Sequence, residues 1–528
     1  MKKALVAVLM ALAVGGQAWA DEPSDWVKCD GYPRPEGAGM TAARLVAVIS
    51  TAGLFGLPES TRYAPAALGQ EGVDACTRAL ATGAADNFWA RRVSMLQARA
   101  LHQIEANNHD AALEDLHAAT AAAEGQTQEE WYRRSLGVSA TLLEAGILVK
   151  RGELQAAEAL ALQAANARPY SATVGNLALY IMAVDVAISA EERVVLDRVA
   201  NLNPSLRATR VRLLEWSGDD TVAADEYDRL LSLERALRGP EFGPPLAVMA
   251  RTTIANLRAN RIERATALAA ELRATLAEPP APLSQSRRER GAPDPMEIAN
   301  YRATQRAEAT QLMTLVEAYE LQRRDDSRGA FAMMTSGRIL AEPATLDLIE
   351  EIVTGPEFAS RAPTMRDAIT RMQEAERTRR IEAIELSKFA EALPPLEQVG
   401  GGNRFRGQGW GANGYDDREL PGGRSIEFSG GSTITTTEEL ALLRAAQLAR
   451  ENGFTGFVVR SRSDYQRYYV TTYAGAETSR APSGFETRME IRYVNVDGAA
   501  PELAGSVVNA GEVWDALSPV FNPPRSRR

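Results

Sequence analysis

Helical spacing dominates this sequence and constrains its fold more than any other feature. From about residue 80 to residue 390 the chain is rich in Ala, Leu, Glu and Arg, and its apolar residues recur at intervals of three and four. That spacing places apolar side chains on one face of an α-helix. Because such a helix must bury its apolar face against a neighbour, the pattern predicts a long array of packed helices.

One pattern recurs inside this array. Residues 141–169 contain two helical segments separated by Gly152, with small residues on both segments and Pro169 after the second. Small side chains allow two antiparallel helices to approach closely, glycine permits the turn, and proline ends the second helix. The segment resembles a tetratricopeptide repeat. Weaker copies occur at residues 96–119 and around Gly218, Asn260 and Asp325.

The tetratricopeptide resemblance implies an α-solenoid, in which stacked helix pairs form a continuous core and a curved surface that binds a protein or peptide. In this pattern Arg251 and Arg258 fall on the inner face of one helix, and we expect them to contact the partner. Leu142, Leu143 and Val149 fall on the inner face of another helix. The alternatives are solvated arginines, leucines that belong to the core, and a helical solenoid of another kind.

The hydrophobic period changes to two in the last quarter of the chain. In residues 486–494 charged side chains alternate with uncharged ones, as expected for an antiparallel sheet with one wet and one dry face. A helix predicted from Glu438 to about Arg450 covers the dry face. Its start is predicted as a capping box, either Thr435 with Glu438 or Thr436 with Glu439.

These periods together predict the fold class. We expect a mostly α protein, an α-solenoid of antiparallel helix pairs followed by a small α+β domain whose antiparallel sheet is covered by a helix.

The start of the C-terminal domain carries a second resemblance. Residues 414–459 resemble a group of small bacterial envelope lipoproteins of unknown function. The similarity lies in "GY" at 414–415, "LRAA" at 443–446, "NGF" at 452–454 and "FVV" at 457–459. This group implies no catalytic residues, and the present chain departs from it because no cysteine follows the predicted cleavage site.

The N-terminus has the parts of a cleaved secretory signal. Lys2-Lys3 precede an apolar run at residues 4–16 and the sequence QAWA. The run is shorter than the roughly 20 residues that span a bilayer. We therefore expect a periplasmic or secreted protein that is soluble after cleavage. In an oxidising compartment Cys29 and Cys76 are expected to form a disulfide, and closing this loop contributes roughly 4 kcal/mol in the loop-entropy model.

Composition shifts suggest the domain boundaries. We predict a signal peptide at 1–20, a disulfide-stapled helical segment at 21–79, the repeats at 80–395, a Gly-rich linker at 396–413, the α+β domain at 414–521 and a basic tail at 522–528.

A proline-rich segment interrupts the repeats. Residues 278–295 contain five prolines and predict a loop or an exposed linker. Its arginines, Arg287, Arg288 and Arg290, either recruit an acidic partner or are simply solvated.

Residue patterns of known catalytic types are missing from the sequence. There is no G-x-S-x-G, H-E-x-x-H or phosphate-binding G-x-x-x-x-G-K-[ST]. His102, His109 and His117 lie within 16 residues, but their spacing does not direct three ligands to one point, so we predict no metal site. Glu486 and Glu490 alternate with arginines on one strand face, which favours ion pairing over a catalytic carboxylate pair.

The expected function follows from these features. The formal net charge of −10 argues against nucleic acid as a partner. We expect a periplasmic scaffold whose repeats bind a protein or peptide partner in the cell envelope, without catalysis or cofactor. The C-terminal domain then docks a second partner or the repeats themselves. The alternative is an envelope enzyme or a polysaccharide- or peptidoglycan-binding protein with its site on the C-terminal domain, where the Arg- and Tyr-rich segment 460–469 suits a carbohydrate surface.

Overall fold

The computed structural model describes residues 24–31, 69–184, 188–216, 218–279, 295–335, 342–358, 360–386, 414–430, 433–473 and 476–521. The predicted signal peptide, the Gly-rich linker, the basic tail and Arg287, Arg288 and Arg290 lie outside these ranges. The described part of the chain divides into two compact units on either side of the Ala140–Thr141 bond. No helix among the described residues combines the length and the apolar character needed to cross a bilayer.

The first unit is helical. Its elements are α2 (Asp25–Asp30), α4 (Gly69–Ala81), α5 (Trp89–Glu105), α6 (His109–Ala122) and the short α7 (Glu130–Arg133). Cys29 and Cys76 join α2 to α4 with an S–S distance of 2.14 Å, as the sequence predicts. Both sulfur-bearing side chains are buried. Beside them Arg91 donates to both carboxylate oxygens of Asp30, also in a buried position.

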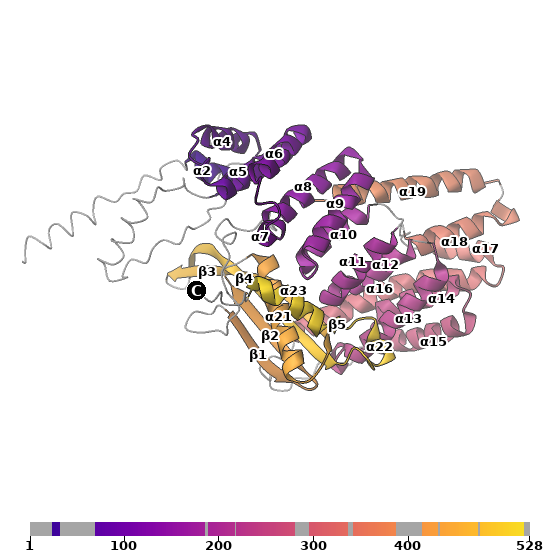
Figure 1. Cartoon of the computed structure of the whole chain (residues 1–528). Coiled ribbons are helices and arrows are strands. Elements are labelled where there is room, and N and C mark those ends of the chain that lie inside the picture. Colours follow the sequence, from indigo (N-terminus) through magenta and orange to yellow (C-terminus); the bar gives the residue numbers. More distant parts are fainter. Residues whose placement is uncertain are drawn as a thin grey trace, which may run out of the picture. The chain divides into compact units, whose positions relative to one another are not determined.

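Successive helix pairs build most of the second unit (Figure 1). The pairs are α8 (Leu136–Arg151) with α9 (Leu154–Ala167), α10 (Ala172–Met182) with α11 (Ala190–Leu202), α12 (Arg207–Glu215) with α13 (Asp220–Leu237), α14 (Leu246–Arg258) with α15 (Ile262–Ala277), and α16 (Pro295–Gln322) with α17 (Ser327–Thr335). The first five residues of α8 belong to the first unit. After the pairs come α18 (Pro343–Val353) and α19 (Ala362–Glu382).

The turns within the pairs fall where the sequence predicts them. Gly152, Gly218, Asn260 and Asp325 each have a left-handed backbone, with φ between 58° and 81°. Asparagine and aspartate tolerate this conformation better than other side chains, and glycine has no steric cost there. Ala157 and Ala161 of α9 are fully buried, because small residues let the paired helices approach.

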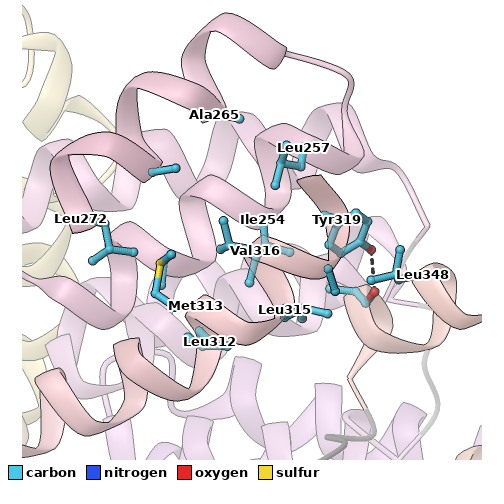
Figure 2. Close-up of a cluster of buried hydrophobic side chains, with 14 of the residues drawn as sticks. Ile254, Leu257, Ala265, Leu272, Leu312, Met313, Leu315, Val316, Tyr319 and Leu348 are labelled. Atoms are coloured by element: carbon cyan, nitrogen blue, oxygen red, sulfur yellow. Dashed lines mark hydrogen bonds between the residues drawn. The ribbon is translucent and has the colours of Figure 1, made fainter. Parts of the chain in front are cut away.

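One large apolar cluster of the described pairs lies among α14, α15, α16, α17 and α18. Figure 2 shows its side chains converging from these helices, among them Ile254, Leu272 and Val316. Leu272 and Val316 are fully buried. The one polar atom that Tyr319 brings into the cluster is satisfied, because its hydroxyl donates to the Ala344 carbonyl at 2.5 Å. The cluster ties the last pairs to α18.

Helix α19 runs back towards the first pairs of the unit. Lys150, at the end of α8, donates to the Ile381 carbonyl at 2.5 Å, and Arg380 donates to the Ala183 carbonyl at the end of α10. The Arg380 guanidinium also lies over the Trp216 ring, at 4.8 Å from its centroid. Leu386 then packs so closely on α8 that a Cβ at Gly146 would collide with it. α19 therefore contacts the C-terminal ends of α8, α10 and α12.

The C-terminal module is an antiparallel sheet covered by helices. Its strands are β1 (Gly414–Leu420), β2 (Gly423–Gly430), β3 (Gly456–Tyr473), β4 (Ala476–Val494) and β5 (Val508–Asn509), in the order β1-β2-β4-β3-β5. The helices are α21 (Ile434–Glu451), α22 (Pro501–Ala504) and α23 (Ala510–Phe521). α21 packs on β2, β3 and β4 and against α23. This arrangement confirms the predicted fold class.

The predicted dry face of β4 is confirmed by burial. Thr487, Met489 and Ile491 are buried under α21. The opposite face is not wholly wet, because Val458 and Val494 pack against the C-terminal end of α13. The sheet is therefore covered by its own helices on one side and, in part, by a repeat helix on the other.

The predicted start of the covering helix is wrong. Neither expected capping box forms: the helix begins at Ile434, and the side chain of Thr433 accepts from the Thr436 N–H. Glu438 and Glu439, the acids expected to complete the boxes, are instead buried and bonded to the repeats. Glu438 and Glu439 therefore contact residues distant in sequence instead of capping their own helix.

Candidate functional site at the junction of the repeats and the module

A buried ion pair joins the first pair of the second unit to α21. Arg168, which follows the last residue of α9, donates from Nε and Nη2 to the two carboxylate oxygens of Glu439, at 3.0 and 2.9 Å. Their side chains are 6% and 0% exposed. A bidentate pair of this kind fixes the relative orientation of both groups. Arg168 therefore sets where α21 lies on the repeats.

Glu438, the neighbouring acid, bonds to the start of α10. Its carboxylate accepts from the Ser171 hydroxyl and from the Thr173 N–H at 3.1 Å. Ser171 is also the N-cap of α10, accepting from the Val174 N–H. A carboxylate at a helix N-terminus satisfies free N–H groups and complements the helix dipole. Glu438 of the module thus completes the N-terminal cap of α10 in the repeats.

Arg462 of β3 completes this network. It donates to Glu438 and also, at 2.9 Å, to Asp464, which in turn accepts from the Thr487 hydroxyl. Burial by itself would lower the pKa of Arg462, but the charges of Glu438 and Asp464 outweigh it and raise the pKa. The guanidinium therefore stays protonated inside the junction. Burial raises the pKa of the Glu438 carboxyl, and the charge of Arg462 opposes this shift.

Strand β3 makes two more contacts with the repeats, both through backbone carbonyls. Arg460 donates to the Leu237 carbonyl at the end of α13, at 3.0 Å from Nη2. Arg207, the first residue of α12, donates to the Val459 carbonyl at 2.5 Å. The module is thus held to the ends of four repeat helices. Its acids bond to residues at the ends of α9 and α10, and arginine–carbonyl hydrogen bonds join it to α12 and α13.

A cavity of about 380 Å³ lies at the same junction. Pro169, Tyr170, Arg198, Asn201 and Leu202 line it from the repeats, and Val507, Val508, Asn509 and Glu512 line it from the module. Burial raises the pKa of Tyr170 and lowers that of Arg198. Glu512, the one carboxylate in this lining, is solvent-exposed. The lining suits the binding of a polar ligand better than acid–base chemistry between two carboxylates.

The two arginines predicted to bind a partner lie in ion pairs within the chain. Arg251 contacts Glu308 and Glu342, each at 3.0 Å. Arg258 contacts Glu215 at 2.6 Å, together with Asp220 and Asp347. The side chains of Arg251 and Arg258 are 11% and 4% exposed. Partner binding through them would require these pairs to open, and it stays a prediction.

The other residues singled out from the sequence have ordinary surroundings. His102 is buried, and its Nε2 lies 2.8 Å from the Cys29 carbonyl. Among the described residues no group of three His, Cys, Asp or Glu side chains is placed to hold a metal ion. Arg488 pairs with Glu486 on its own strand and with Glu427 on β2, as expected for an ion-paired strand face. Leu142, Leu143 and Val149 are buried in the core.

Arg168, Ser171 and Glu438 are the site residues that the sequence analysis missed. From the sequence alone, Arg168 is the polar last residue of a predicted helix, and Ser171 is an ordinary N-cap candidate for the next one. One signal was present: adjacent residues of a helix point about 100° apart, so Glu438 and Glu439 cannot both lie at the centre of its solvent-facing side. No model of a protein family matches this chain, and no curated protein or solved structure is significantly similar to it.

Proposed function

We propose that this protein is an exported, non-enzymatic scaffold of the cell envelope whose helix pairs bind a protein or peptide segment. The disulfide and the lack of a membrane-spanning helix among the described residues are compatible with export. The module has a supporting role in this proposal: it clamps the first helix pairs of the second unit in a fixed arrangement.

One observation carries the proposal: the pairs already bind a helical segment, α19 of the same chain. Lys150 bonds to a backbone carbonyl of α19, so this contact does not depend on a particular side chain of the bound helix, and Arg380 of α19 bonds to a backbone carbonyl of the repeats. Ala362 is buried at the start of α19, but most of the helix remains exposed. A surface that already holds one helix, in part through that helix's main chain, suits binding of another polypeptide beside it or in its place.

An exposed aromatic residue lies beside this contact. Tyr180 on α10 is 51% exposed, and it precedes Ala183, the acceptor of the Arg380 bond, by about one helical turn. Exposed aromatic side chains are enriched where proteins bind one another. We place the partner surface on the C-terminal halves of α8, α10 and α12, next to α19.

Site-specific photo-crosslinking in the intact, exported chain tests this proposal. A photoreactive residue at position 180 is expected to capture a discrete envelope polypeptide in the native host. The matched control is position 163 on α9, where Gln163 is exposed on the second helix of a pair. Capture from position 180 alone supports the platform. No capture, or equal capture from both positions, argues against it.

The cavity of about 380 Å³ favours a second candidate function, the binding of a polysaccharide such as a peptidoglycan fragment. Its volume lies within the usual range of small-molecule sites, about 300–1,000 Å³. Calorimetric titration of the intact chain with soluble peptidoglycan fragments tests it. Saturable binding that is lost in Asn509→Ala and kept in Tyr180→Phe supports this candidate, and an absence of heat with every fragment excludes it.

A further inference from the structure

Asn201 also lines a second, smaller cavity at the same junction. Its volume is about 70 Å³, and residues from α11, α12 and α13 line it together with the segment Pro501–Ser506 of the module. About 10–15 Å³ suffices for one water molecule, so this cavity has room for several waters or for one small oxyanion. Glu502, Gly505 and Arg229 are exposed at its rim, which leaves a path from solvent.

Arg207 is the unusual member of this lining. Its side chain belongs to a residue that is 4% exposed, and it makes one hydrogen bond, from Nη2 to the Val459 carbonyl. Its Nε–H has no hydrogen-bond partner, and no carboxylate of the described residues lies within ion-pair distance of it. A buried charge without a counter-ion is costly, because it has lost water without gaining a partner.

The neighbouring charges do not compensate Arg207. The nearby Glu226 carboxylate is already shared by Arg193, Arg210 and Arg229, at 2.7 to 3.0 Å. Asp197 is paired with Arg210 at 2.5 Å. The cavity lining thus holds three arginines, Arg207, Arg210 and Arg229, against two acids, Glu226 and Glu502.

Arg207 nevertheless keeps its charge at neutral pH. Burial lowers its pKa to about 10, the attraction of Glu234 opposes this shift, and the repulsion of Arg238 adds to it. Glu234 is itself bonded to Arg238. The site therefore presents a permanent, desolvated guanidinium to a cavity that has space for a ligand.

We propose that this cavity binds a small oxyanion, a phosphate or carboxylate group, with Arg207 as its main ligand. The anion supplies the missing counter-charge and accepts the free Nε–H. Ser506 lines the same cavity and offers a hydroxyl from the module, and Asn201 already reaches this segment by donating to the Gly505 carbonyl at 3.2 Å. A bound anion would therefore join α12 of the repeats to residues 505–506 of the module and strengthen their junction.

The test uses the intact mature chain with sodium phosphate, sodium acetate and sodium chloride at equal ionic strength. Calorimetry is expected to give saturable binding of phosphate or acetate, and the melting temperature is expected to rise with the same concentration dependence. Arg207→Met should abolish both. The matched control is Arg212→Gln, which removes an exposed arginine of the same helix that does not line the cavity. It should leave binding unchanged.

A second variant keeps the test decisive if Arg207→Met does not fold. Ser506→Val leaves Arg207 in place and adds bulk at the cavity wall, so it is expected to weaken binding at least tenfold. A response to phosphate alone assigns a phosphoryl ligand, and a response to both salts assigns any small oxyanion. An equal response of all variants, or an absence of saturable binding to the wild type, overturns the proposal. Neither result bears on crosslinking from position 180.

Discussion

The cluster around α14 to α18 and the junction between the repeats and the module are both buried, but they are held in different ways. The cluster is apolar, and the hydroxyl of Tyr319 is bonded to a carbonyl. The junction buries the charged groups of Arg168, Glu439, Glu438 and Arg462. One region is stabilised by removing apolar area from water, and the other depends on each charge meeting its partner.

This difference predicts two kinds of response to mutation. Each large apolar side chain contributes about 1.5–3 kcal/mol by burial, so losses in the cluster accumulate step by step. A buried ion pair has a small net effect while it is intact, because desolvation offsets attraction, and a large one when a single partner is removed. We infer that the junction contributes the fixed orientation of the module more than the stability of the chain.

The largest expected effect comes from breaking the pair across the junction. Arg168→Met should lower the free energy of unfolding by about 3–5 kcal/mol, because it removes the bidentate guanidinium partner of the buried Glu439 carboxylate. The double variant Arg168→Met with Glu439→Leu should recover most of that loss. Urea denaturation of the intact chain measures both. If Arg168→Met alone lowers the free energy of unfolding by less than about 1 kcal/mol, the junction does not depend on each buried charge meeting its partner.

A slightly smaller effect is expected in the apolar cluster. Leu312 is 2% exposed, and Leu312→Ala should cost about 2–5 kcal/mol through lost burial and the cavity left behind. Leu312→Met keeps the volume and should cost less than about 1.5 kcal/mol. Ile262→Ala, at a position 42% exposed, should change little. The comparison fails if the methionine variant is as damaging as the alanine variant.

The contact of α19 should respond more weakly than either region. Gly146→Ala places a Cβ against Leu386, and such overpacking costs about 1–3 kcal/mol. Because Leu386 lies just beyond α19, we expect faster amide hydrogen exchange in residues 362–382 and unchanged exchange in the α14–α18 cluster. Gln155→Ala, at an exposed position of α9, is the control. Unchanged exchange in α19 would mean that Leu386 does not anchor it.

The smallest effect concerns alkaline pH. Burial raises the pKa of Tyr301 on α16 to about 12, opposed by the Arg238 guanidinium 4.4 Å from the centre of its ring. The folded chain therefore keeps this proton after the unfolded chain has lost it, so the free energy of unfolding should fall between about pH 10 and pH 12. Tyr301→Phe should flatten that fall, and denaturation at stepped pH measures it. An unchanged pH dependence in the variant would assign the fall to other groups.

Features that depend on neighbours in the chain could be predicted from the sequence. The turns at Gly152 and Asn260 have the left-handed backbone that their residue types favour. The alternation in β4 predicted its buried face, since a period of two places alternate residues on opposite sides. The end of α21 is another example: Gly453 is left-handed and Asn452 caps the helix. In each case the determining contacts lie within a few residues.

The junction could not be predicted in this way. Arg168 and Glu439 are 271 residues apart, and nothing in either local pattern names the other as its partner. Glu438 was assigned to a cap of its own helix, but the fold uses it to complete the cap of α10. The acids around Arg251 lie on or beside α16 and α18, so their convergence follows only from how the pairs stack.

The shared N-terminus of α10 has a consequence for how this chain can change over generations. The carboxylate of Glu438 accepts hydrogen bonds from Ser171 and Thr173. A gene fragment that encodes residues 414–521 alone therefore lacks these donors. Recombination that moved this fragment into an unrelated protein would remove the partners that Arg168, Ser171 and Thr173 provide for Glu439 and Glu438. The two segments should therefore be inherited together, and a duplicated copy of either should persist only where the other accompanies it.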